Sequence, residues 1–300
     1  MCFIVYLGLN LPHFYRIIGV KGVDNMTIEP KYTLYLDREV IDEVNYEEKD
    51  LLCVLAILLE CCKNSVVYGD CEIACTPSTL WANITRKVKT TATDRRNFVS
   101  SINRLSENGT ITLLDHETKT IKWSTLLKID ASNILHNSNC PFVCISSDEL
   151  DGIKYKEYKH ATLAIILQLY VSIVSYFDMS QIEAFDKAIA NGENPIDESY
   201  DLYGELNYHI SCWASYERLM TTKHSSDIPS DTWLQRQLLS DSLKLLEELG
   251  LIAIVRPQVK GSKEHFTNHY CFPRHKKYVQ QIANMQAKQI VYKRQEKLTE

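Results

Sequence analysis

The sequence is poor in residues that break regular structure, and it has no long apolar run. Only 10 of its 300 residues are Gly and 8 are Pro, so we expect short loops and extensive helices and strands. No stretch reaches the roughly 20 apolar residues that a membrane-spanning helix needs. The apolar segment 2–11 is followed by Pro12, His13 and Arg16 and lacks the features of a secretory signal. We therefore expect a cytoplasmic protein with no membrane partner.

The first residues do not fit the pattern of the rest. Residues 1–26 are treated as an N-terminal extension, and Met26 is an alternative start because a clearer pattern follows it. The sequence leaves open which of Met1 and Met26 begins the protein.

Catalytic and metal-binding motifs are also missing from the sequence. It has no Gly-rich phosphate loop, no Walker-type lysine motif, no HExxH and no two-histidine motif. The ten cysteines include two pairs four residues apart but no CxxC, so buried reduced thiols are a better interpretation than a zinc site. We expect no enzyme activity, no cofactor and no metal.

Apolar spacing predicts a short strand over 32–36 and helices over 47–62, 76–84 and 93–107. Thr76-Pro77-Ser78 marks a helix start, and Asn108-Gly109 ends the last helix. A hairpin follows, with apolar residues at 111–113 and 121–123 on either side of a polar turn. This order of helix, short helix, helix and hairpin is that of a winged helix-turn-helix.

The second half repeats this order. It predicts a long helix over 160–177, a short helix over 211–223 and a helix that ends at Gly250. Strands are expected over 251–254 and 266–272. Seven acidic residues and one lysine lie between Ser180 and Glu205, which predicts an acidic insertion or mobile loop.

The predicted fold is mainly α with small β-hairpins (α+β), arranged as tandem winged helix-turn-helix domains. Domain 1 covers residues 27–135, a linker covers 136–155, and domain 2 covers 156–275 with the acidic insertion at 180–205. Residues 276–300 are expected to form a basic C-terminal helix or tail.

Three segments of the second half resemble a known family. They are 212–216 (CWASY), 246–252 (LEELGLI) and 268–270 (NHY), and they look like the winged-helix domains of plasmid replication initiators and phage replisome organisers. The resemblance covers about 60 residues well and the first half loosely. It implies binding to repeats in origin DNA and recruitment of host replication machinery, such as the replicative helicase or its loader.

Local charge favours a DNA partner although the net charge is −5. Residues 86–104 contain six basic residues and one acidic residue, and residues 256–297 contain ten basic residues and two acidic ones. The rest of the chain is therefore strongly acidic. Such segregation is typical of a DNA-binding face on an acidic protein, and chance clustering on a solvated surface is the alternative.

The helical spacing predicts which residues contact DNA. Side chains opposite the buried stripes are expected to read bases, whereas neighbouring cations and wing residues contact phosphates. In domain 1 these residues are Arg95, Arg96, Ser100, Asn103, Arg104, Lys119 and Lys122; in domain 2 they are Arg236, Gln237, Ser240, Lys244, Lys260 and Lys263. Asp231 and Asp241 lie on or near the second recognition helix and argue against base reading there.

The sequence leaves three functions open. The first is a replication initiator that binds origin repeats in double-stranded DNA. The second is a transcriptional regulator that binds operator repeats through the same contacts. The third is a winged-helix adaptor that binds proteins without DNA specificity. A homodimer is compatible with each of them.

Overall fold

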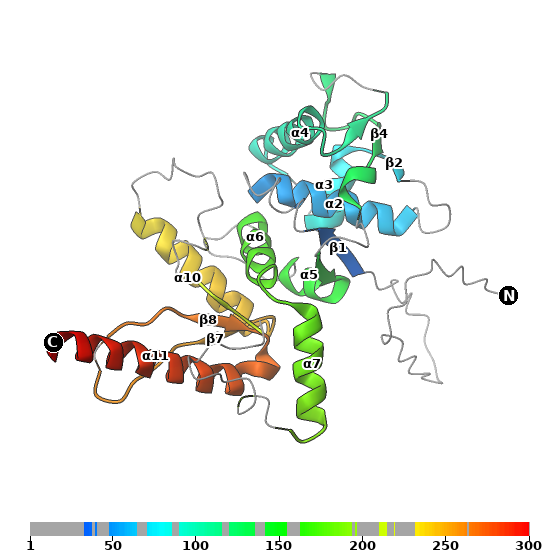
Figure 1. The fold of residues 1–300 in the computed structure, drawn as a ribbon. Helices are drawn as coiled ribbons and strands as arrows, with labels where there is room; N and C mark the ends of the chain where they lie inside the picture. Colours follow the sequence, from blue (N-terminus) through cyan, green and yellow to red (C-terminus); the bar gives the residue numbers. More distant parts are fainter. Residues whose placement is uncertain are drawn as a thin grey trace, which may run out of the picture. The chain divides into compact units, whose positions relative to one another are not determined.

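The computed structural model describes residues 33–37, 40, 48–64, 71–85, 90–115, 120–135, 142–154, 163–193, 196, 210–214, 219, 232–262 and 264–299. These residues form a mixed α+β structure in which helices dominate and three small antiparallel sheets accompany them (Figure 1). The predicted class, mainly α with small β elements, is therefore confirmed. The predicted N-terminal extension, residues 1–26, lies outside the described residues.

The first three-stranded sheet combines one strand that precedes a pair of helices in the sequence with two strands that follow this pair. Its strand order is β2-β4-β3, so the last strand in sequence lies between the other two. Helices α2, α3 and α4 pack on one another beside this sheet (Figure 1). The elements are α2 (Glu48–Asn64), β2 (Glu72–Cys75), α3 (Pro77–Thr85), α4 (Ala92–Glu107), β3 (Thr112–Leu113), β4 (Leu127–Asp130) and the short helix η2 (Ser132–Ile134).

The predicted hairpin is correct in its first strand and wrong in its second. Strand β3 pairs with β4 in the register Thr112↔Asp130, so the returning strand is 127–130 and not 121–123. Trp123 instead packs its ring against Trp81 and Phe98, with centroid distances of 6.3 and 6.2 Å. Packing of this half-buried aromatic ring against two helices outweighs the alternating pattern that predicted a strand.

The predicted linker 136–155 is also wrong over its described part. Residues 142–146 form β5 (Phe142–Ser146), which pairs with β1 (Thr33–Asp37), and α5 (Ser147–Lys154) follows directly. The backbone and hydroxyl of Ser146 donate to Glu149 Oε2 at 2.8 and 2.9 Å, which caps this helix. A strand partner more than 100 residues away gives no local signal in the sequence.

The second half contains another three-stranded sheet with the corresponding order, β6-β8-β7. Helices α6 and α10 pack on each other, and α11 packs on β7 and β8. The elements are α6 (Leu163–Val174), α7 (Met179–Ala190), β6 (Ser211–Trp213), α10 (Thr232–Glu248), β7 (Ala253–Val255), β8 (His269–Cys271), η3 (Pro273–His275) and α11 (Lys276–Thr299).

Two predictions for the second half need correction. The first part of the supposed acidic loop is helix α7, whose N-terminus Asp178 caps by accepting from the backbone N–H groups of Ser180 and Gln181. Buried Ile182 and Phe185 give this helix an apolar face that its acidic composition hides. The short helix expected from Ser211 begins instead as strand β6, which pairs with β8.

Within the described ranges, no single helix combines the length and apolar character needed to cross a membrane. Helices α6 and α7 reach that combination only together, across a bend of 67°.

The two helix-to-strand junctions match residue by residue. Gly109 after α4 and Gly250 after α10 adopt φ values of 75° and 70°, in the left-handed region that favours glycine. In each junction, the backbone N–H of the residue before the glycine donates to a carbonyl in the last turn of the helix. The backbone N–H of the second residue after the glycine donates to the carbonyl of a buried leucine. These bonds are Asn108 to Arg104 and Ile111 to Leu105 in the first junction, and Leu249 to Leu245 and Ile252 to Leu246 in the second.

Candidate nucleic-acid interface

Helix α4 begins with a complete capping box. The Thr91 hydroxyl accepts from the Asp94 backbone N–H at 3.1 Å, and the Asp94 carboxylate accepts from the Thr91 backbone N–H at 3.1 Å. The helix therefore starts at Ala92, one residue before the predicted start. This cap fixes the direction of the first turn, from which Arg95 and Arg96 project.

The buried side of α4 consists of Phe98, Ser101, Ile102 and Leu105. Helical geometry places Arg96 on the opposite side, and both Arg95 and Arg96 are exposed. The helix dipole repels cations from its N-terminal turn, so these two arginines do little for the stability of the helix. Their exposure agrees with the helical spacing, and their contact with DNA stays a prediction.

Arg104 is placed differently from the prediction. Its guanidinium Nη2 and Nε donate to the two carboxylate oxygens of Asp50 on α2, at 2.6 and 3.1 Å. The Asp50 side chain is only 7% exposed, so it needs this partner. The expected projection of Arg104 toward DNA is wrong because the bidentate pair holds α4 on α2.

Ser100 and Asn103 are half-buried. Ser100 Oγ accepts from Arg104 Nη1 at 3.1 Å, which leaves its own hydroxyl proton free to donate. Asn103 Oδ1 is buried and has no hydrogen-bond partner among the described atoms. Bidentate reading of an adenine by Asn103 therefore requires its side chain to turn outward.

Lys122 and Lys128 are exposed cations among the described residues around β3 and β4. Lys122 is exposed, and its backbone N–H donates to Thr125 Oγ1 at 2.9 Å. Lys128 is occupied by an ion pair with Asp115 at 2.9 Å, and this hydrogen bond raises the pKa of Lys128. Lys119 lies outside the described residues.

Helix α10 presents a more acidic face. Gln237 Nε2 donates to Asp241 Oδ1 at 2.9 Å, and both residues lie opposite the buried Leu239 and Leu243. Lys244 is exposed on the same face, and Ser240 is half-buried at its margin. Arg236 lies in the first half of the helix. A carboxylate at this place would repel a phosphate backbone. The position of Asp241 on this face is consistent with the expectation that this helix does not read bases.

The loop between β7 and β8 carries the other predicted cations. Lys260 is exposed beside Gly261, whose φ of 85° makes the turn, whereas Lys263 lies outside the described residues. His269 lies on β8, where its ring is buried and stacks on Trp213 at a centroid distance of 6.1 Å. Burial lowers the pKa of His269 to about 4.

The stacking of Trp213 on His269 is a contact that the sequence did not predict. Both lie on the second sheet, where Trp213 is in β6 and not in the helix predicted over 211–223. The run 210–213 alternates apolar and polar residues until Trp213, and this alternation was the available signal for a strand.

The cysteines form no reactive or metal-binding site in the described parts of the chain. The described cysteines are free thiols, and no group of three or more His, Cys, Asp or Glu residues there is arranged to hold a metal ion. Burial raises the pKa of Cys61, Cys75 and Cys271 to about 12. These thiols stay protonated at neutral pH and pack as small apolar side chains.

No protein-family model matches the chain, and neither the curated proteins nor the solved structures include one that matches it.

Proposed function

We propose that this chain is a tandem winged-helix protein that binds double-stranded DNA without covalent chemistry, and that α4 is its main reading helix. The observation that carries the proposal is the repeated topology. Each half contains a helix, a strand, a later helix ending at a left-handed Gly, and two strands, with the third strand between the first two. This repeated order supports the proposal of one winged helix-turn-helix in each half.

Helix α4 is the favoured contact because its outward face is both polar and cationic. Arg96 lies opposite the buried stripe, where it can donate to both O6 and N7 of a guanine. Arg95 and Lys122 flank it and suit phosphates. Three further basic residues, Arg86, Lys87 and Lys89, precede the helix in the sequence.

The biological role that we propose is replication initiation at an origin with repeated sites. Its support is the resemblance of segments 212–216, 246–252 and 268–270 to plasmid and phage replication proteins. A transcriptional regulator would use the same contacts, and the two roles differ in where the sites lie.

Footprinting of the purified protein across its own gene and flanking DNA tests this proposal. We expect protection of repeated sites, together with the loss of that protection in Arg96→Ala. Arg95→Ala should instead weaken specific and non-specific binding alike, because a phosphate contact carries no sequence information. Lys187→Ala, which removes an exposed cation on α7, is the control for net charge.

The pattern of protection separates the candidate roles. Repeated sites away from a promoter support an initiator, and a single promoter site supports a regulator. Uniform coating that disappears at moderate salt contradicts specific DNA binding and favours a protein adaptor, because only phosphate contacts would remain.

A further inference from the structure

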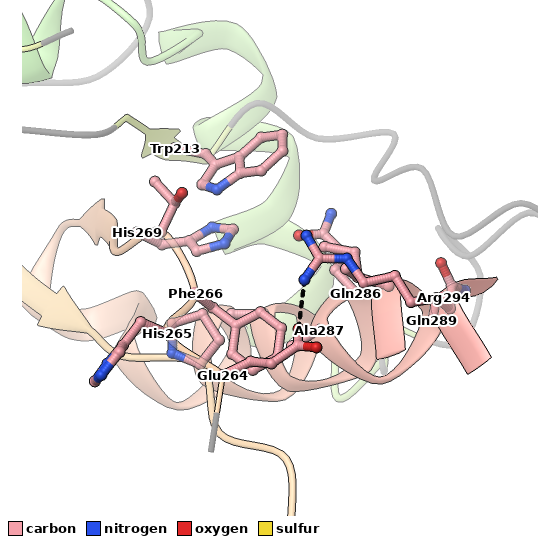
Figure 2. A pocket seen from close by; sticks show the side chains of 13 residues that line it. Trp213, Glu264, His265, Phe266, His269, Gln286, Ala287, Gln289 and Arg294 are labelled. Carbon is pink, nitrogen blue, oxygen red and sulfur yellow. Dashed lines mark hydrogen bonds and ion pairs between the residues drawn. The ribbon is translucent and has the colours of Figure 1, made fainter. Parts of the chain in front are cut away.

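A pocket of about 380 Å³ lies beside the second sheet, and none of its lining residues is among the DNA contacts proposed above. Figure 2 shows its walls: Trp213 and His269 from the sheet, Phe266 from the loop between β7 and β8, and Gln286 and Arg294 from α11. Its volume is within the range of small-ligand sites in proteins.

Trp213 is unusual because its large ring remains 57% exposed at the mouth of this pocket. One face of the indole lies on His269 with an angle of 17° between the rings. A tryptophan held in place on one side and open to solvent elsewhere is a platform for another flat ring.

His269 supplies the second observation. It is only 4% exposed, it lines the pocket, and its Nδ1 has no hydrogen-bond partner among the described atoms. A buried polar atom without a partner is costly, so a ligand that bonds to it gains more than an exposed contact would. Because burial lowers its pKa to about 4, the ring is neutral at pH 7 and offers one donor and one acceptor.

The remaining lining residues define the chemistry of a ligand. Gln286 and Gln289 offer amide donors and acceptors, whereas Phe266, Ala287 and Ile290 give an apolar floor. Arg294 is held at the rim by Glu264, with an Nη1–Oε2 distance of 2.8 Å. The surrounding segment 256–297 carries ten basic residues and two acidic ones, which favours a ligand with an anionic group.

We propose that this pocket binds a nucleobase that stacks on Trp213 and bonds through its polar edge to His269 and the two glutamines. A nucleotide has the flat ring and the hydrogen-bonding edge in its base, and the anionic group in its phosphate, that these residues match. The base comes from an unpaired DNA strand or from a free nucleotide. This activity goes beyond duplex recognition and does not depend on α4.

Quenching of tryptophan fluorescence tests the proposal on the full-length protein. We expect dAMP, dTMP or short oligodeoxynucleotides to quench the emission of the wild type, and Trp213→Ala to lower the affinity by about tenfold or more. For this variant, which loses the reporting ring, binding of labelled oligonucleotides is followed by anisotropy. Tyr292→Ala removes another exposed aromatic side chain from α11, outside the pocket, and should bind as the wild type does.

The ligands distinguish the source of the base. Tight binding of oligonucleotides with weak binding of mononucleotides assigns the pocket to an unpaired strand, and equal binding assigns it to free nucleotides. Arg96→Ala should leave nucleobase binding unchanged. A loss of duplex binding through α4 can therefore be distinguished from a loss of nucleobase binding in the pocket. Absence of quenching, unchanged binding in Trp213→Ala, or equal competition by N-acetylphenylalaninamide would overturn the proposal.

Discussion

The two halves of the chain end their long helices in the same way but use the surfaces of those helices differently. Gly109 and Gly250 make equivalent left-handed turns, and buried Ser101 and Ser242 occupy equivalent places in α4 and α10. The difference lies on the opposite side, where α4 presents Arg96 and α10 presents Gln237 bonded to Asp241. The junction is therefore common to both halves, whereas the outward faces of the two helices differ.

The inner sides of the two helices also differ at one matching position. Arg104 on α4 pairs with the buried Asp50, whereas Leu245 on α10 packs against the apolar core. An ion pair of this kind is costly to break but not clearly better than an apolar contact. The two halves thus give two solutions to the same packing problem, and they can be compared by mutation.

The largest effect is expected from breaking the ion pair. Arg104→Leu leaves the Asp50 carboxylate buried without a partner and should lower the free energy of unfolding by about 3 kcal/mol. The double variant Asp50→Leu/Arg104→Leu should recover most of this loss, because it supplies an apolar pair of the type that Leu245 uses. Urea unfolding measures both changes. A single variant as stable as the wild type would show that the pair does not hold α4.

Acid should affect the second half more than the first. His269 has a folded-state pKa of about 4, below its ordinary value of 6.5, so the unfolded chain takes up the proton first as the pH falls. Stability is therefore complete above pH 6.5 and declines toward pH 4, by about 2 kcal/mol at pH 5. The described residues from α2 to β4 contain no histidine.

Amide hydrogen exchange resolves this difference between the halves. Protection of β8 should fall between pH 6.5 and pH 5, after correction for intrinsic exchange rates, and protection of β4 should fall less. His269→Phe keeps a ring beside Trp213 and should reduce the slope. Burial also lowers the pKa of His275, so part of the slope should remain. Equal loss in both sheets would contradict this assignment.

The smallest effect is expected on the outward face of α10. Asp241→Ser gives this position the residue found at Ser100 on α4 and removes a carboxylate that would repel phosphate. If the second half also contacts DNA, duplex affinity should rise about threefold at low salt. The control is Glu193→Ser, which removes an exposed carboxylate after α7. An equal gain in both variants would exclude α10 from the interface.

Local signals in the sequence predicted the parts of the fold that depend on neighbouring residues. The apolar spacing of α4 and the glycines after both long helices act within one or two turns, and both junctions were predicted. Strand β5 depends on β1, which lies more than 100 residues earlier, so the local pattern predicts only a linker there. Helix α7 is not predicted from the sequence, because its two buried apolar residues give only a weak helical pattern within an acidic segment.

The residues of the candidate interface also separate into those that local spacing predicts and those that depend on tertiary contacts. Helical spacing identified Arg95 and Arg96 as exposed, since exposure on one helix follows from its own period. It failed for Arg104, because the position of Asp50 on α2 is a tertiary feature. The pocket at Trp213 combines residues from β6, β8, a loop and α11, and no local pattern joins them.

The most direct test of DNA reading by α4 is the footprint of the wild type beside that of Arg96→Ala, at near-physiological salt. We expect protected repeats with the wild type and no protected repeats with the variant, while both proteins unfold at the same urea concentration because Arg96 is exposed. An identical footprint from the two proteins would contradict the assignment of Arg96 and α4.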